Sequence, residues 1–193
     1  PINIIGTSDP LPINYDLKVP SAQVKSSILL AGLNVKGRTT VIENKPTRDH
    51  TEKMLKSFGA DIEIVKKGLS NYISVVGFPC MKPNEISVPG DISSAAFPIA
   101  LASIIPNSEI KIKNVGLNPL RDGFIKTLIE MGANIKIKNK HLEAGELVAD
   151  LKVNYTPNLK GVEVPSERSA KMIDEYPILS IIAATAQGPT IMK

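Results

Sequence analysis

The sequence has no tryptophan, a single cysteine and few aromatic residues, which make up 4% of its 193 residues. One cysteine, Cys80, excludes an internal disulfide framework and is typical of a reducing compartment, so we expect a cytoplasmic protein. No histidine lies near Cys80, so a buried or loop thiol is favoured over a nucleophile. The longest apolar runs, such as 178–186, are too short to cross a bilayer, and we expect no membrane contact.

Basic residues are also not clustered. Lys and Arg outnumber Asp and Glu by 23 to 19, a net charge of +4, and the lysines are spread along the chain. A protein that binds nucleic acid more often shows a basic stripe with stacking aromatic residues. We therefore expect no nucleic acid and favour small anionic ligands. His50 and His141 lie far apart without other metal ligands nearby, so we predict no metal and no cofactor.

An internal repeat is the strongest indication of the fold. Residues 54–64 match residues 127–137 at an offset of 73 (127 minus 54), and Arg48-Asp49 falls on Arg121-Asp122 at the same offset. Residues 188–192 repeat the pattern of 37–41, which starts a third copy. Each copy has the pattern of helix, strand, helix and further strands, so we predict an α/β (α+β) fold of repeated helix-strand-helix-strand units.

Periodicity and turn residues place the individual elements. Helices are predicted at about 21–33, 48–58, 93–105 and 174–186, and strands at about 15–19, 38–43, 60–65, 72–76, 85–88 and 109–113. Thr47 is predicted to cap the second helix. Because the sequence starts at Pro1 rather than Met and stops inside an apparent strand, we expect an internal fragment of a longer protein.

The stretch 20–33 is typical of a helix N-terminus that could bind an anion. Ser21 follows a proline as the cap, and an apolar run then ends near Gly32. The free N–H groups and the dipole of such a terminus favour negative charge, and Gln23 and Lys25 add side-chain donors. Taken alone, the stretch favours an ordinary capped core helix.

Five stretches in one order resemble the enolpyruvyl transferase family, and within it the branch that acts on shikimate 3-phosphate. They are 21–33 (SAQVKSSILLAGL), 47–61 (TRDHTEKML…FGAD), 90–97 (GDISSAAF), 118–121 (NPLR) and 172–177 (MIDEYP). The resemblance implies transfer of the enolpyruvyl group from phosphoenolpyruvate to the 5-hydroxyl of shikimate 3-phosphate, with release of phosphate, by a monomeric enzyme without a cofactor.

The resemblance also implies an architecture. Six similar units would form two globular domains, three units to each, with helices inside and sheets outside. We expect residues 1–88 to belong to the first domain, 89–91 to form the hinge crossover, and 92–193 to belong to the second domain. Each domain would be incomplete in this chain.

The resemblance assigns roles to five residues. Ser21, Ala22, Gln23 and Arg48 would bind substrate: Ser21 and the helix N-terminus would bind the 3-phosphate, and Gln23 would reach both substrates. Ala22, where a second serine could stand, resembles the branch that is less sensitive to glyphosate, and sensitivity stays open. Asp174 would bind substrate and act catalytically, as the base for the 5-hydroxyl.

Each role has a structural alternative. Arg48 also fits a first-turn surface charge paired with Asp49 or Glu52, and Asp174 also fits a simple helix N-cap. Lys25 points away from Gln23 on a helix, so we expect it at the surface or between domains.

Two further residues are expected to be structural. Arg121 is predicted to form a salt bridge, and Glu175 to be a capping or structural acid.

Two other functions fit part of the pattern. The paralogous branch that uses UDP-N-acetylglucosamine shares the fold but would carry a different segment at 21–25. A non-catalytic repeat scaffold would need none of Ser21, Gln23, Arg48 and Asp174, whereas this chain has all four.

Overall fold

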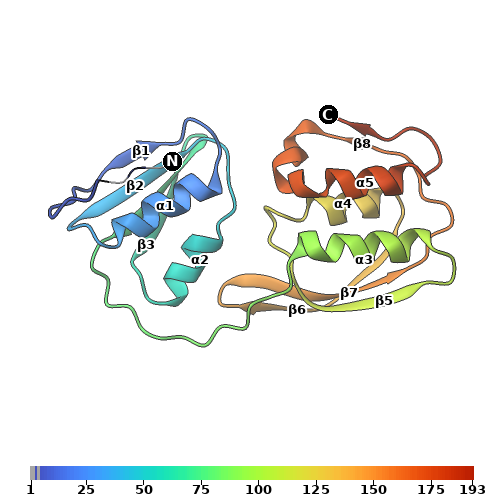
Figure 1. Ribbon diagram of the computed structural model, residues 1–193, viewed down its shortest axis with the longest axis horizontal. Helices are drawn as coiled ribbons and strands as arrows, with labels where there is room; N and C mark the ends of the chain where they lie inside the picture. Colours follow the sequence, from blue (N-terminus) through green and yellow to red (C-terminus); the bar gives the residue numbers. More distant parts are fainter. Residues whose placement is uncertain (1–2, 4) are drawn as a thin grey trace. The chain divides into compact units, whose positions relative to one another are not determined.

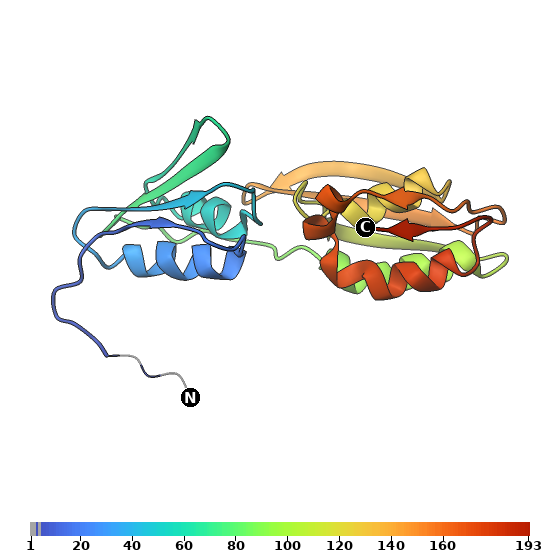
Figure 2. The same cartoon turned by 90° about the horizontal axis from the view of Figure 1, so that it is seen from above.

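A computed structural model describes residue 3 and residues 5–193, and the chain divides into two compact units, Pro1–Glu85 and Ile86–Lys193. Each unit is mixed α/β, with helices packed on one face of a β-sheet (Figures 1 and 2). None of the helices in this described part of the chain is long and apolar enough to cross a membrane.

The first unit contains a four-stranded sheet. Across the sheet the strands are β1 (Asn14–Asp16), β2 (Arg38–Glu43), β4 (Ser70–Val76) and β3 (Ile62–Lys67). β1 runs parallel to β2, and the other pairs are antiparallel. Helix α1 (Ala22–Gly32) packs on β2 and β4, and α2 (His50–Ser57) packs on β3. The small apolar core of this unit comprises Leu17, Leu29, Val41, Ile73 and Val75.

The second unit has a larger core. It begins with α3 (Ile92–Ile104), β5 (Glu109–Gly116), α4 (Gly123–Glu130), β6 (Asn134–Glu143) and β7 (Glu146–Asn154), and its sheet order is β5-β7-β6. The short strands β8 (Glu163–Val164) and β9 (Ile191–Met192) pair in parallel. Between them lie two 3₁₀ turns, η1 (Ser166–Lys171) and η2 (Ile173–Glu175), and helix α5 (Tyr176–Ala183), which packs on α3.

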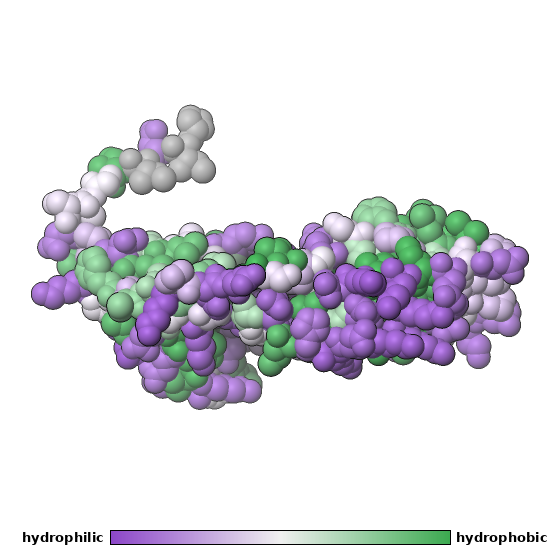
Figure 3. Space-filling model, turned by 90° about the horizontal axis from the view of Figure 1, so that it is seen from below, coloured by the Kyte–Doolittle hydropathy of each residue, from purple (hydrophilic) through white to green (hydrophobic). Residues whose placement is uncertain are grey.

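Strand alternation explains why only one face of the second sheet is covered. On β5 and β6 the isoleucines, such as Ile112 and Ile137, are partly buried against the core, whereas the intervening lysines, such as Lys111 and Lys138, are exposed. Hydrophilic side chains cover much of the visible face of this unit in Figure 3.

The predicted repeat is present in the structure. Both units follow the order helix, strand, helix, strand, strand. In each unit the last of these three strands, β4 or β7, lies between the other two in the sheet. The helix-to-strand turn after α2 and the one after α4 have the same geometry, with Gly59 at φ +87° and Gly132 at φ +90°. In the first turn Gly59 N–H bonds to Lys56 O and Ala60 N–H to Leu55 O. This cap needs a residue at positive φ, which explains the glycine at the same place in both copies.

Two predicted elements differ from the structure. The predicted strand 85–88 is wrong: residues 79–89 form neither helix nor strand, and Val88 is 85% exposed. Prolines at 79, 83 and 89 remove backbone donors, which hinders pairing there. The second helix starts at His50 rather than 48, and Thr47 does not cap it; Asp49 occupies the N-cap position, and Thr47 bonds to Glu43 instead.

Other predictions are closer. The helix predicted at 174–186 is α5 preceded by η2. Cys80 lies exposed in a loop, as one of the two predicted alternatives has it.

Gly77, directly after β4, should not tolerate a side chain. A Cβ atom there would lie 1.7 Å from the carbonyl oxygen of Val35 and 2.7 Å from its carbonyl carbon. Because these are backbone atoms, they can move only with the α1–β2 connection. We expect Gly77→Ala to lower the free energy of unfolding by about 1–3 kcal/mol, as overpacked sites do. In the control Gly6→Ala, where no atom lies within 4 Å, we expect a change below about 0.5 kcal/mol. Thermal unfolding of both variants is the measurement, and equal melting temperatures would contradict the close contact.

Candidate functional site

Ser21 caps α1, as the sequence predicts. Its backbone is extended, its hydroxyl oxygen accepts the Val24 N–H at 3.3 Å, and its O–H donates to Gln23 Oε1 at 3.3 Å. Ser21 and Ala22 are half-buried, and Gln23 is exposed. The first turn of α1 has no acidic residue. This helix start therefore presents a hydroxyl, an amide and backbone N–H groups, a set of donors that suits an anion.

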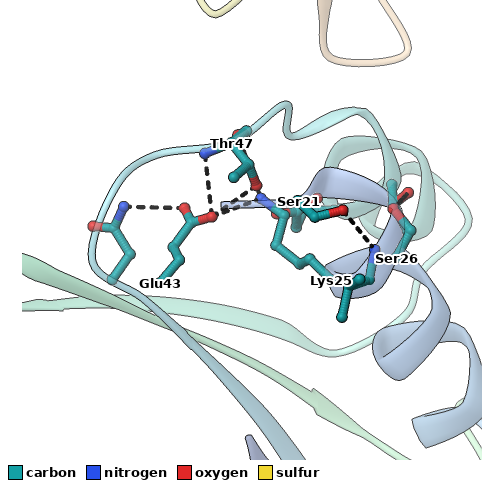
Figure 4. A network of polar contacts seen from close by, with 9 residues as sticks. Ser21, Lys25, Ser26, Glu43 and Thr47 are labelled. Carbon is teal, nitrogen blue, oxygen red and sulfur yellow. Dashed lines mark hydrogen bonds and ion pairs between the residues drawn. The ribbon is translucent and has the colours of Figure 1, made fainter. Parts of the chain in front are cut away.

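Lys25, one turn further along α1, lies at the centre of a buried polar network (Figure 4). Its side chain is fully buried, so the prediction of a surface or interdomain lysine is wrong. The ammonium lies 2.6 Å from Glu52 Oε1 and 3.2 Å from Glu43 Oε2, and it donates to the carbonyl oxygen of Thr47 at 3.4 Å. Lys25 thus joins α1 to β2, to α2 and to the connection between them.

Glu43 is the more fully bonded of the two carboxylates. Its Oε2 accepts the Thr47 N–H at 3.2 Å and the Thr47 hydroxyl at 2.9 Å, and its Oε1 accepts from Asn71 Nδ2 at 3.3 Å. Glu52 Oε2 is buried without a hydrogen-bond partner in the described part of the chain. Burial raises the pKa of Glu52 above its usual value, against the opposing hydrogen bond and charge of Lys25.

Arg48 follows Thr47 directly and is half-buried, two residues before α2 begins. The two helices are also joined by the hydroxyls of Ser26 and Thr51, which lie 2.7 Å apart. The structure therefore brings Ser21, Gln23 and Arg48 to the neighbouring starts of α1 and α2 within the first unit.

Asp174 belongs to the second unit. It is exposed in η2, and the residue in the N-cap position of α5 is Glu175 rather than Asp174. The alternative reading of Asp174 as the helix N-cap is therefore wrong.

A second polar network holds the turn that contains Asp174. Buried Glu175 accepts the hydroxyl of Ser93, and that hydroxyl oxygen accepts Arg121 Nη2 at 2.7 Å. Arg121 lies 3.1 Å from Asp91, which caps α3 by accepting the Ser94 N–H at 2.8 Å. Burial acts to raise the pKa of Asp91, but the Ser94 hydrogen bonds and the Arg121 charge hold it below its usual value. Arg121 is thus a structural salt bridge and Glu175 a structural acid, as predicted.

Across the described residues, no group of three or more His, Cys, Asp or Glu side chains could hold a metal ion.

Comparison with known proteins identifies the family. The chain matches the family model of EPSP synthase (3-phosphoshikimate 1-carboxyvinyltransferase) over residues 1–193. The chain belongs to the EPSP synthase family. This confirms the resemblance drawn from the five sequence stretches.

Individual EPSP synthase relatives agree with the family match. Proteins named 3-phosphoshikimate 1-carboxyvinyltransferase from Paracoccus denitrificans and Ruegeria are 54% and 50% identical, over 100% of this chain and 43% of each relative. A structure of EPSP synthase from Acinetobacter baumannii has a TM-score of 0.87 at 44% identity and covers 98% of this chain and 42% of its own. The enolpyruvyl transferase NikO from Streptomyces tendae, at 17% identity and a TM-score of 0.73, shares the fold. The chain thus spans less than half the length of its EPSP synthase relatives.

Sequence reasoning missed the network around Lys25. The buried residues of α1 are Lys25, Leu29 and Gly32, so the lysine occupies a core position of its helix. Glu52 and Leu55 are likewise the buried residues of α2. The signal that could have revealed the pair is that each charged residue is spaced from the apolar core residues of its own helix by three or four positions. The lysine has this spacing in α1 and the glutamate has it in α2.

Removal of the Lys25 charge should strongly destabilise the first unit. Lys25→Met keeps the apolar stem but leaves two buried carboxylates without their cation, and breaking such a pair costs about 3–5 kcal/mol. Thermal or denaturant unfolding measures the loss. The control Lys18→Met removes a lysine that is 79% exposed beside Asp16, and should change stability by less than about 1 kcal/mol.

The loss should depend on pH. Without Lys25, the hydrogen bond and the charge that oppose burial are lost, so the folded-state pKa of Glu52 rises further above its usual 4.5. At a pH between the unfolded-state pKa and the raised folded-state pKa of Glu52, the folded state binds a proton that the unfolded state releases. The free energy of unfolding therefore falls as pH rises through this range. In Lys25→Met/Glu52→Gln this fall should be reduced, and an unchanged pH profile would contradict the assignment.

Proposed function

We propose that the protein containing this chain is a 3-phosphoshikimate 1-carboxyvinyltransferase. It transfers the enolpyruvyl group of phosphoenolpyruvate to the 5-hydroxyl of shikimate 3-phosphate and releases phosphate. The observation that carries the proposal is the pair of neighbouring helix starts with Ser21, Gln23 and Arg48, in a chain about 50% identical to proteins of that name. Those names also favour the shikimate branch over the UDP-N-acetylglucosamine branch and over a scaffold.

The first unit is proposed to bind the phosphate side of shikimate 3-phosphate. Ser21 donates its hydroxyl, and the first turn of α1, with Ala22, offers its N–H groups. Gln23 is exposed and has a long side chain. We assign to it contacts with both substrates. Arg48 adds a planar cation whose fork of donors fits phosphate or paired hydroxyls. No acidic residue in the first turn of α1 opposes this charge.

The second unit is proposed to supply the base. Asp174 is exposed, while its neighbour Glu175 is buried and bonded to Ser93, so the turn is held and the Asp174 carboxylate faces solvent. We assign to Asp174 the binding of the shikimate ring hydroxyls and the removal of the 5-hydroxyl proton. This proton transfer is acid–base chemistry that a carboxylate can carry out.

The domain limits are proposed on the basis of the family resemblance. We propose that residues 1–88 belong to one globular domain, that 89–91 are the hinge crossover, and that 92–193 belong to the second domain, with helices inside and sheets outside. Gly90 bonds to β5 through Asn114 O at 2.7 Å, which joins this end of the crossover to the second unit. The monomeric state and the cytoplasmic location stay predictions.

Arg48→Ala should weaken the binding of shikimate 3-phosphate. The test uses the full-length protein, meaning this chain carried within a protein of its relatives' length. Loss of a hydrogen bond to a charged group of about 1.5–3 kcal/mol corresponds to about ten- to a hundredfold weaker binding. Calorimetric titration measures the affinity. The control Arg38→Ala removes an arginine of the same unit that pairs with Glu63 on the sheet, and should bind normally. Wild-type affinity in Arg48→Ala would contradict the binding role and favour the alternative, a first-turn surface charge.

Asp174→Asn should separate catalysis from binding. The asparagine keeps the shape and can still hydrogen-bond a hydroxyl, but it does not accept a proton. Loss of a general base typically lowers kcat by about 10²- to 10⁴-fold, while the melting temperature and the affinity for shikimate 3-phosphate should change little. Glu167→Gln, an exposed acid in η1, should keep normal turnover. A stable, substrate-binding Asp174→Asn enzyme with near-normal kcat would rule out the base.

A further inference from the structure

Thr47 directs all of its polar groups into the buried network. Its N–H and its hydroxyl both donate to Glu43 Oε2, at 3.2 and 2.9 Å, and its carbonyl oxygen accepts from Lys25 at 3.4 Å. Thr47 is only 9% exposed, although residues 44–49 form neither helix nor strand. The connection between β2 and α2 is therefore fixed at this one residue by side chains from β2 and α1.

A continuous set of bonds runs from the start of α1 to Arg48. The Lys25 N–H donates to the Ser21 carbonyl oxygen at 3.1 Å, and the Lys25 ammonium holds the Thr47 carbonyl. That carbonyl belongs to the peptide unit shared with Arg48. The position of the Arg48 backbone relative to Ser21 is thus set by the lysine side chain and by Thr47.

The second copy of the repeat shows that the fold does not require this network. At the offset of 73, Leu120 stands where Thr47 stands and Ile125 where Glu52 stands. Counted from the N-caps Ser21 of α1 and Asp91 of α3, Ala95 stands where Lys25 stands. That copy nevertheless forms the same strand order. The arginine of that copy, Arg121, is held instead by Asp91 and Ser93.

We propose that Thr47 is a positioning residue for Arg48: anchored by Glu43 and Lys25, it sets the arginine beside the start of α1 so that both engage the same anionic ligand. The inference rests on the proposed function. A buried ion pair is a poor source of stability compared with apolar packing, but it can specify one geometry. Small misplacements of a binding group reduce its contribution steeply.

The experiment compares two valine substitutions in the full-length protein. Thr47→Val and Thr40→Val each remove one buried hydroxyl of the first unit; Thr40 is 8% exposed and bonds to Ser74 at 2.9 Å, on the sheet. We expect similar losses in melting temperature. Calorimetry should show the dissociation constant for shikimate 3-phosphate rise by about fivefold or more for Thr47→Val and stay within about twofold for Thr40→Val. Thr47→Ser, which keeps the hydroxyl, should restore wild-type affinity.

A double-mutant cycle tests whether Thr47 acts through Arg48. In an Arg48→Ala background, the further substitution Thr47→Val should change the affinity little, because the group that it positions is absent. An undiminished effect there, equal weakening by both valine variants, or wild-type affinity in Thr47→Val would each overturn the positioning role while leaving the proposed function in place. A wild-type protein that does not bind shikimate 3-phosphate would overturn the proposed function and this inference with it.

Discussion

The first unit is built around one buried ammonium group. A charge can leave water only if it is paired and hydrogen-bonded, so burial of Lys25 in α1 requires acidic partners beside it. β2 supplies Glu43 and α2 supplies Glu52. The apolar cluster beneath α1 has five buried residues, none of them from α2, so it does little to fix the relation of the two helices. The ion-pair network therefore determines where the connection between β2 and α2 can lie.

In the second unit, apolar packing fixes the positions of the corresponding helices. Its core contains Phe124, Leu128, Leu151 and Leu179, each fully buried. Its polar network is displaced to the start of α3, where Asp91 and Ser93 engage the repeat copy of Arg48. The N-cap of α1, which corresponds to Asp91 at the start of α3, is Ser21, so the start of α1 offers no carboxylate for the same bridge. Two copies of one pattern thus give the equivalent arginine different surroundings.

The sequence was informative where local chemistry decides the structure. The Ser21 cap and the four predicted helices follow from capping preference and periodicity, which act over a few residues. Burial of Lys25 was not predictable in this way, because its acidic partners lie 18 and 27 residues further on (43 minus 25 and 52 minus 25). The strand expected at 85–88 failed for a related reason: local composition suits a strand, but a strand also needs a neighbour to pair with.

The proposed functional residues share one position in the architecture, the residues just before or at the start of a helix. Ser21 precedes α1 by one residue, Arg48 precedes α2 by two, and Asp174 precedes α5 by two. Helix N-termini carry free N–H groups and partial positive charge, so they favour anions and ionised carboxylates. The opposite ends of α2 and α4 carry the glycine turns that complete the fold. In α2 the proposed binding arginine and the glycine turn lie at opposite ends, so the turn can be retained in α4 while the chemistry of the helix start diverges.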